Sequence, residues 1–292
     1  MRTFLTRIKN YLSLVRFGHT VFAMPFALIG FSLAVSQSEY SFSLRLFLLI
    51  ILCMIFARNA AMGFNRIIDN RFDALNPRTK NREIPRGIIS IRAATIFVLI
   101  NASLFIITTA FINRLTLILS PVALMIVLGY SLTKRYTALC HFILGLGLSL
   151  APIGAYISVT GSFAVLPVIY SFIVLTWSGG FDIIYSLPDD EFDRSQELRS
   201  VPSALGLKSA LAISIIVHFV TFCLVVTAGC LGNGGTFFWV GALLFASLLI
   251  YQHAIVKHDD ISRVDIAFGT TNGLASLIFA FFVILDLYLR HQ

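Results

Sequence analysis

Long, nearly continuous apolar runs constrain the fold of this 292-residue chain more than any other feature. A helix needs about 20 mostly apolar residues to cross the hydrocarbon core of a membrane. Nine runs meet this requirement: 17–37, 43–64, 93–112, 115–132, 138–158, 163–186, 207–230, 235–252 and 266–288. Only 12% of the residues are charged, too few to cover a soluble domain of this length, and the runs lack the alternation of membrane β-strands. The sequence therefore predicts an all-α integral membrane protein with nine transmembrane helices.

The basic residues are distributed unevenly between the two sides of the membrane. When alternate connections are assigned to alternate sides, one side holds 18 of the 22 lysines and arginines, and the other holds Arg45, Arg114 and Arg290. Cytoplasmic connections carry such an excess of positive charge, so the formal net charge of +8 does not point to nucleic acid. We expect a multi-pass protein of the inner (plasma) membrane, with a cytoplasmic N-terminus and an external C-terminus.

Two long polar segments, 65–92 and 187–206, fall on the predicted cytoplasmic side. Each contains the pattern D-x-x-F-D, at 69–73 and 189–193, followed by R-x-x-P. Such an echo is typical of an internal repeat. We predict one domain, 1–292, built from two related halves at about 17–158 and 163–288, with both polar segments at a single site.

The acidic residues of these segments follow helical spacing. Asn65, Asp69 and Asp73 lie four residues apart, so on a helix they form a row roughly 12 Å long on one face. Asp189 and Asp193 share this spacing, and Asp182 lies two turns earlier. Pro188 is expected to kink or interrupt the helix between them, because proline lacks the amide hydrogen that a helix interior requires.

Two such rows indicate a site for divalent ions. Mg²⁺ prefers oxygen ligands and is usually held by one or two carboxylates together with substrate phosphates. One acidic helix end alone would be explained by solvation, but two on the same side, both followed by arginines, favour a diphosphate substrate. The predicted Mg²⁺ ligands are Asn65, Asp69 and Asp73 for one ion and Asp189 and Asp193 for another. A diphosphate at the mouth of an apolar bundle suggests a lipid diphosphate, whose tail enters the bilayer.

At these residues the chain resembles the UbiA superfamily of intramembrane aromatic prenyltransferases. Its first motif, N-x-x-x-D-x-x-x-D, matches 65–73, and its second matches FDIIYSLPDDEFD at 181–193. Further family features match NPRTKNREIPRG, the turn YSLTKR and VRFGHTVFAMP. Pro188 and the stretch ELRS depart from the usual pattern. The resemblance implies nine helices around a central cavity and dependence on Mg²⁺.

Within the superfamily, the chain most resembles the 4-hydroxybenzoate polyprenyltransferase-like branch, including members that prenylate 1,4-dihydroxy-6-naphthoate in menaquinone synthesis. The expected reaction is Mg²⁺-dependent transfer of a polyprenyl group from its diphosphate to an aromatic acid, in ubiquinone or menaquinone biosynthesis. The candidate catalytic residues are Asp69, Asp73, Asp182, Asp189, Asp193 and Tyr185. The candidate substrate-binding residues are Arg16, Asn65, Arg78, Arg82, Tyr130, Lys134 and Arg135.

Two alternatives remain at this point. Another acceptor of the superfamily, such as haem, chlorophyllide or a lipid that forms an ether, would use the same metal site. A cation transporter could also carry paired acidic motifs in two repeats. Its ions must cross near the membrane midplane, whereas these acids cluster at the cytoplasmic ends of helices, beside arginines that repel cations.

Overall fold

The computed structural model describes residues 2–15 and 22–290, and every regular element in these two ranges is a helix. The α-helices are α1 (Arg2–Leu14), α2 (Met24–Val35), α3 (Leu44–Ile68), α4 (Asn70–Leu75), α5 (Ile91–Ala110), α6 (Arg114–Thr133), α7 (Cys140–Thr160), α8 (Val165–Ser186), α9 (Asp190–Ser195), α10 (Val201–Leu205), α11 (Leu207–Leu231), α12 (Thr236–Ile255) and α13 (Asn272–Arg290). A 3₁₀ turn, η2 (Leu187–Asp189), joins α8 to α9, and a π-helical turn, η3 (Ile266–Thr271), leads into α13.

Eight segments of the described chain are long and apolar enough to cross a membrane. Six of them are the helices α3, α5, α6, α7, α11 and α12. The other two are Val165–Ser195, which includes α8, and Ile266–Arg290, which includes α13. The predicted span at 17–37 is represented by the shorter apolar helix α2, and residues 16–21 lie outside the described ranges. The prediction of an all-α, multi-pass membrane protein is confirmed.

Local sequence explains where several spans begin. Asn113 caps α6, because its side chain accepts from the amide of Thr116 at 2.9 Å while the Thr116 hydroxyl accepts from the amide of Asn113. Ser90 caps α5 by accepting from the amide of Ala93 at 3.2 Å. Side-chain acceptors of this kind satisfy amides that a helix start leaves without partners. Asn113 is the last residue of the three-residue connection between α5 and α6, so α6 begins as soon as the chain has turned.

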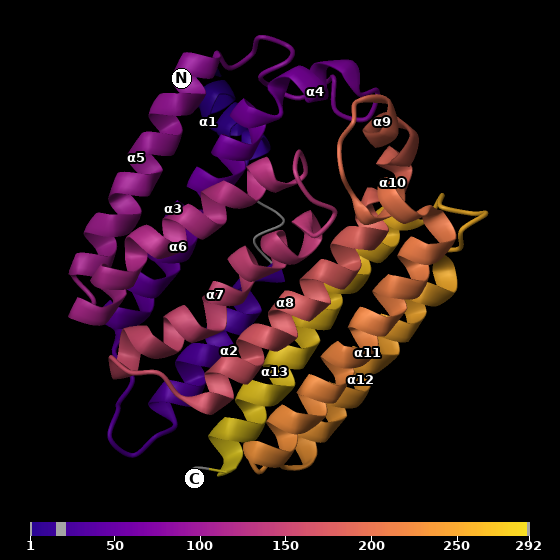
Figure 1. Cartoon of the computed structure of the whole chain (residues 1–292). Coiled ribbons are helices and arrows are strands. Elements are labelled where there is room, and N and C mark those ends of the chain that lie inside the picture. Colours follow the sequence, from indigo (N-terminus) through magenta and orange to yellow (C-terminus); the bar gives the residue numbers. More distant parts are fainter. Residues whose placement is uncertain (1, 16–21, 291–292) are drawn as a thin grey trace.

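An aromatic core joins the helices of the C-terminal half to α2. Trp177 and Phe181 of α8, Phe26 of α2, Phe245 of α12 and Phe279 of α13 are all buried and meet at ring-centroid distances between 4.9 and 6.2 Å. Aromatic rings at such distances pack favourably in tilted or edge-on arrangements. In Figure 1 these helices form one side of the bundle, and α3, α5 and α6 form the other.

The two polar segments lie at the same end of the bundle. Figure 1 shows α4 and α9 with α10 at the end that also holds α1, while the C-terminus lies at the opposite end. The second segment contains the interruption expected at Pro188, since α8 ends at Ser186 and η2 follows it. The first row also differs from a continuous helix: α3 ends at Ile68, and Asp69 separates it from α4 with φ −87° and ψ 1°.

Candidate active site

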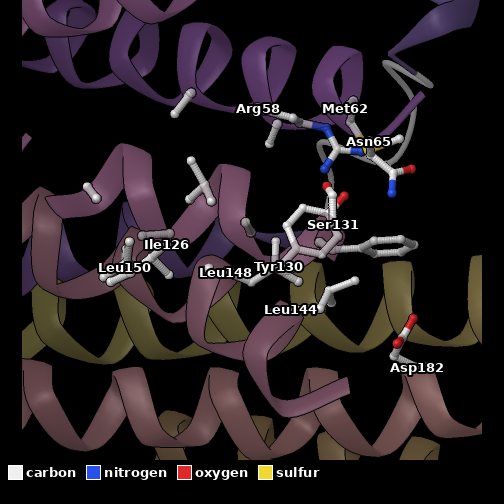
Figure 2. Close-up of a pocket in the computed structure, with 18 of the residues that line it drawn as sticks. Arg58, Met62, Asn65, Ile126, Tyr130, Ser131, Leu144, Leu148, Leu150 and Asp182 are labelled. Atoms are coloured by element: carbon white, nitrogen blue, oxygen red, sulfur yellow. The ribbon is translucent and has the colours of Figure 1, made fainter. Parts of the chain in front are cut away.

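A cavity of about 620 Å³ opens among α3, α5, α6, α7 and α8. Its lining changes from charged residues at the end with the polar segments to aliphatic and aromatic residues further inside, and it continues as far as Ile112, Ser158 and Phe163 near the opposite helix ends. In the part drawn in Figure 2, Arg58 and Asn65 of α3 lie on one wall, Tyr130 of α6 projects into the middle, and Asp182 of α8 lies across from them.

The first acidic row keeps its helical register through the break at Asp69. The amide of Asp69 donates to the carbonyl of Asn65 at 2.9 Å, and that of Asp73 donates to Asp69 at 2.7 Å. The side-chain amide of Asn65 donates to Asp69 Oδ2 at 2.8 Å, and Arg135 Nη2 lies 3.5 Å from Asp69 Oδ1. Arg82 Nη1 pairs with Asp73 Oδ1 at 2.6 Å, while the buried Oδ2 of Asp73 has no hydrogen-bond partner in the described part of the chain.

The second row is held by residues from two distant segments and by the nearby Ser200. Asp189 accepts from Asn76 Nδ2 at 3.0 Å and from Arg78 Nη1 at 2.7 Å, so the first polar segment contacts the second directly. Asp193 is fully buried, and it pairs with Lys134 Nζ at 2.8 Å and accepts from Ser200 Oγ at 2.9 Å.

The two rows therefore face one site. The predicted residues that line the cavity are Asn65, Asp69, Asp73, Arg82, Tyr130, Lys134, Arg135, Asp182, Tyr185, Asp189 and Asp193. Arg78 is absent from that lining, but its guanidinium carbon lies 5.0 Å from the ring centroid of Tyr185, and its Nη1 atom pairs with Asp189. Arg16 lies outside the described residues.

Electrostatics at the mouth of the cavity follow from burial and from the neighbouring charges. Burial, together with the charge of Asp73, raises the pKa of Asp69 to about 6, although Arg135 and Lys134 oppose this change. Burial by itself would lower the pKa of Lys134, but the contacts with Asp193 and the charge of Asp189 outweigh burial and raise it. Lys134 is therefore a fixed positive charge at the cavity mouth, whereas Asp69 exchanges its proton near neutral pH.

Three further residues of the site were not predicted from the sequence. Asn76 binds Asp189, Ser200 binds Asp193, and His141 lies 2.7 Å from Asp182 through its Nδ1 atom. Ser200 lies within the second R-x-x-P copy, at 199–202, so the repeated pattern could have indicated that it belongs to the site. Asn76 begins the stretch NPRTKNREIPRG, in which only Arg78 and Arg82 were assigned a role, and His141 lies in no motif. Their partners are 113 and 41 residues away in sequence, so local spacing does not pair them.

The oxygen-rich rows offer a hard cation only part of its coordination shell. In the described ranges, no three His, Cys, Asp or Glu side chains converge on one point as a metal site. Mg²⁺ usually binds one or two carboxylates and completes its shell with waters and substrate phosphates, so an incomplete protein shell suits it. The buried, unpartnered Oδ2 of Asp73 is an available carboxylate oxygen of this kind.

Comparison with solved structures shows the same fold. A UbiA homolog from Aeropyrum pernix K1, solved in its apo form, is 33% identical and superimposes with a TM-score of 0.82 over 92% of this chain and 98% of that chain. A UbiA homolog from Archaeoglobus fulgidus bound to GPP and Mg²⁺ is 19% identical, with a TM-score of 0.75 over 96% of this chain and 99% of that chain.

Sequence comparison gives relatives with a named activity. The chain is 30% identical over 285 residues to a 4-hydroxybenzoate octaprenyltransferase of Nitrosomonas europaea, covering 95% of each chain. It is 29% identical over 231 residues to the enzyme of that name from Aliivibrio fischeri, covering 78% of this chain and 79% of the relative. The model of the UbiA prenyltransferase family matches residues 23–284. These matches favour the enzyme over the cation transporter, and the chain belongs to the UbiA prenyltransferase family.

Proposed function

We propose that this membrane prenyltransferase transfers a polyprenyl group from polyprenyl diphosphate to an aromatic hydroxy acid, with Mg²⁺, at the cytoplasmic face of the inner membrane. The supporting observation is the cavity, which joins two facing acidic rows and several basic side chains at its mouth to a long apolar interior. A diphosphate with a hydrocarbon tail has the same division into a charged head and an apolar body.

The acidic rows are the proposed metal site. Asn65, Asp69 and Asp73 would hold one Mg²⁺, and Asp189 and Asp193 would hold a second, directly or through water. When bound, these ions would neutralise the diphosphate and make it a better leaving group. Asp73 supports this assignment, because one of its buried oxygens has no hydrogen-bond partner in the described structure.

The basic residues are proposed to bind the diphosphate. Arg78, Arg82 and Lys134 each pair with a carboxylate of one of the rows, at 2.7, 2.6 and 2.8 Å, so a phosphate bound at the rows would be within their reach. Guanidinium groups bind phosphate oxygens in a bidentate way. Arg16 is assigned the same role on the sequence resemblance alone.

The reaction replaces a carbon–oxygen bond by a carbon–carbon bond. The bond between the allylic carbon and the diphosphate breaks, and its electron pair leaves with the diphosphate. The ring carbon ortho to the acceptor hydroxyl then attacks the allylic cation, and a proton leaves that carbon. Tyr130 and Tyr185 would position the leaving group, Arg135 would pair with the acceptor carboxylate, and Asp182 would orient the acceptor hydroxyl.

The acceptor we favour is 4-hydroxybenzoate, because relatives at 29–30% identity over most of the chain carry that acceptor in their names. The sequence resemblance adds 1,4-dihydroxy-6-naphthoate, which presents the same carboxylate and ring hydroxyl on a larger ring system. To decide between them, the purified protein would be incubated with Mg²⁺, a polyprenyl diphosphate and both acids, and the products identified by mass. Prenylated 4-hydroxybenzoate is expected as the main product. Parallel incubations would offer haem, chlorophyllide or a lipid glycerol as acceptor, and product from one of these with none from either acid would refute the proposal.

Loss of one carboxylate from either row should abolish transfer without preventing folding. We expect Asp69→Ala or Asp189→Ala to lower turnover ~100-fold or more at saturating Mg²⁺, since each removes a proposed ligand. Asp259→Ala, in an exposed connection after α12, is the matched control and should retain full activity. All three proteins should insert and elute as the wild type in detergent, and near-normal turnover of either row variant would contradict the metal assignment.

A further inference from the structure

His141, in the first turn of α7, is buried in the cavity wall beside Asp182 and takes no part in the chemistry described above. We propose that His141 is a positioning residue that fixes the carboxylate of Asp182, so that one of its oxygens is presented to the acceptor in the cavity. This inference rests on the proposed role of Asp182 in orienting the acceptor hydroxyl.

The hydrogen bonds of the imidazole define its tautomer. The backbone amide of Val201 donates to Nε2 of His141 at 3.2 Å, and an amide N–H can only donate. Nε2 must therefore carry the lone pair, and the ring proton lies on Nδ1. Nδ1 in turn lies 2.7 Å from Asp182 Oδ2, so His141 donates to the carboxylate. With both nitrogens engaged and only 2% of the residue exposed, the ring has one orientation available.

The contact leaves the other oxygen of Asp182 for a substrate. Asp182 and His141 both line the cavity, but the Asp182 side chain keeps 19% of its surface exposed, whereas the His141 side chain keeps only 2%. In the described part of the chain, Oδ2 bonds to His141 and no protein donor bonds to Oδ1. In Figure 2 the Asp182 carboxylate is directed from α8 toward the cavity wall formed by α3 and α6. Oδ1 can thus accept a hydrogen bond from the acceptor hydroxyl.

The start of α10 contacts both His141 and Asp193. Val201 follows Ser200, whose hydroxyl donates to Asp193 Oδ2 at 2.9 Å. The residue before Ser200 ties this stretch to the turn before α7, because the amide of Arg199 donates to the carbonyl of Lys134 at 2.7 Å. His141 consequently links Asp182 to the segment that holds the second acidic row. The second R-x-x-P copy, 199–202, supplies both contacts, through Ser200 and Val201.

Two variants of nearly equal shape separate the donor function of His141 from its packing. In His141→Asn the amide nitrogen takes the place of Nδ1 and can donate to Asp182, whereas His141→Leu has no donor, and both side chains are too short to replace Nε2 at Val201. We expect the Leu variant to lose about 30- to 100-fold in kcat/KM for the aromatic acid, and the Asn variant to stay within about 5-fold of wild type. The KM for the polyprenyl diphosphate and the unfolding temperature in detergent should be equal for the two variants.

A second pair, His141→Gln and His141→Met, repeats the comparison with longer side chains and is used if either short variant does not fold. The inference is overturned if the amide and its apolar counterpart have equal activity, whether high or low, or if the difference between them lies in the KM for the diphosphate. Failure of the proposed function is distinguishable, because the wild-type protein would then prenylate no aromatic acid.

Discussion

At the scale of single residues, each of four carboxylates of the two rows is paired with a basic side chain. Asp69, Asp73, Asp189 and Asp193 each lie within 4 Å of an arginine or lysine nitrogen. A buried carboxylate without a partner is strongly destabilising, and Asp193, which is fully buried, depends on Lys134 for its compensation. A cation arriving at the rows would compete with these bases, and a diphosphate would bind the bases so released. Binding of the two should therefore be cooperative.

Proton competition at Asp69 predicts how Mg²⁺ dependence changes with pH. The pKa of Asp69 is raised by burial and by Asp73 to about 6, so the carboxylate gains a proton as pH falls through this value. The protonated form does not bind a cation, so the Mg²⁺ concentration for half-maximal activity should be constant above about pH 7 and rise roughly tenfold per unit well below pH 6. Titrating Mg²⁺ in transfer assays between pH 5 and 8 measures this. If the Mg²⁺ concentration for half-maximal activity stays constant down to pH 5, protons do not compete with Mg²⁺ for Asp69, and its assignment as a ligand is contradicted.

At the scale of helices, small residues set the position of α7, which forms one wall of the cavity. Gly30 of α2 packs so closely on α7 that a Cβ atom there would lie 2.0 Å from the carbonyl oxygen of Pro152. On α7 itself, a Cβ atom at Gly145 would lie 2.5 Å from the carbonyl oxygen of Leu175 in α8. Small residues at such crossings allow membrane helices to approach backbone to backbone. Both contacts fix α7 between its neighbours.

Gly30→Ala should therefore destabilise the bundle. The added methyl group meets backbone atoms, which cannot rotate away, so α2 and α7 must separate at a cost of about 1–3 kcal/mol. Gly154→Ala on α7 is the control, because a Cβ atom there meets nothing within 4 Å and alanine favours helix. Thermal unfolding in detergent should show a lower midpoint for Gly30→Ala and an unchanged or higher midpoint for Gly154→Ala. Equal midpoints would mean that α2 and α7 are not packed as described.

At the scale of the whole molecule, the polar segments, the mouth of the cavity and the N-terminal helix lie at one end (Figure 1). That end also carries most of the lysines and arginines, which favours a cytoplasmic location. The chain remains, as a proposal, a single domain of two related halves at about 17–158 and 163–288. The contact between Arg78 and Asp189 agrees with two halves that face one site, without testing a duplication.

Sidedness is testable with single cysteines at opposite ends of the bundle. His258→Cys lies in the exposed connection after α12, and Ser162→Cys lies in the exposed turn between α7 and α8. In a background with Cys223 and Cys230 replaced by alanine, a membrane-impermeant maleimide should label position 258 only in inverted vesicles and position 162 only in right-side-out vesicles. The reverse pattern would place the active site on the external face and contradict the proposed topology.

Much of the site was predictable because its signals are local. Hydropathy defines spans along the chain, and the spacing of Asn65, Asp69 and Asp73 places them on one helical face even though the helix breaks at Asp69. The effect of Pro188 was predictable for the same reason, since proline acts on its own turn of helix. Eight spans were confirmed in the described ranges, and the first, with Arg16, falls partly outside them.

The amino-acid sequence by itself determined the membrane-spanning helices, the acidic rows and the basic side chains near them, because hydropathy and helical periodicity depend only on neighbours within a few turns. Only the tertiary structure decided which base pairs with which acid, that Asn76, Ser200 and His141 support the rows, and that the apolar cavity continues from them. The physical reason is that these contacts join residues up to 113 positions apart. Their geometry is set by how the helices pack, at glycines such as Gly30 and Gly145, which no local pattern specifies.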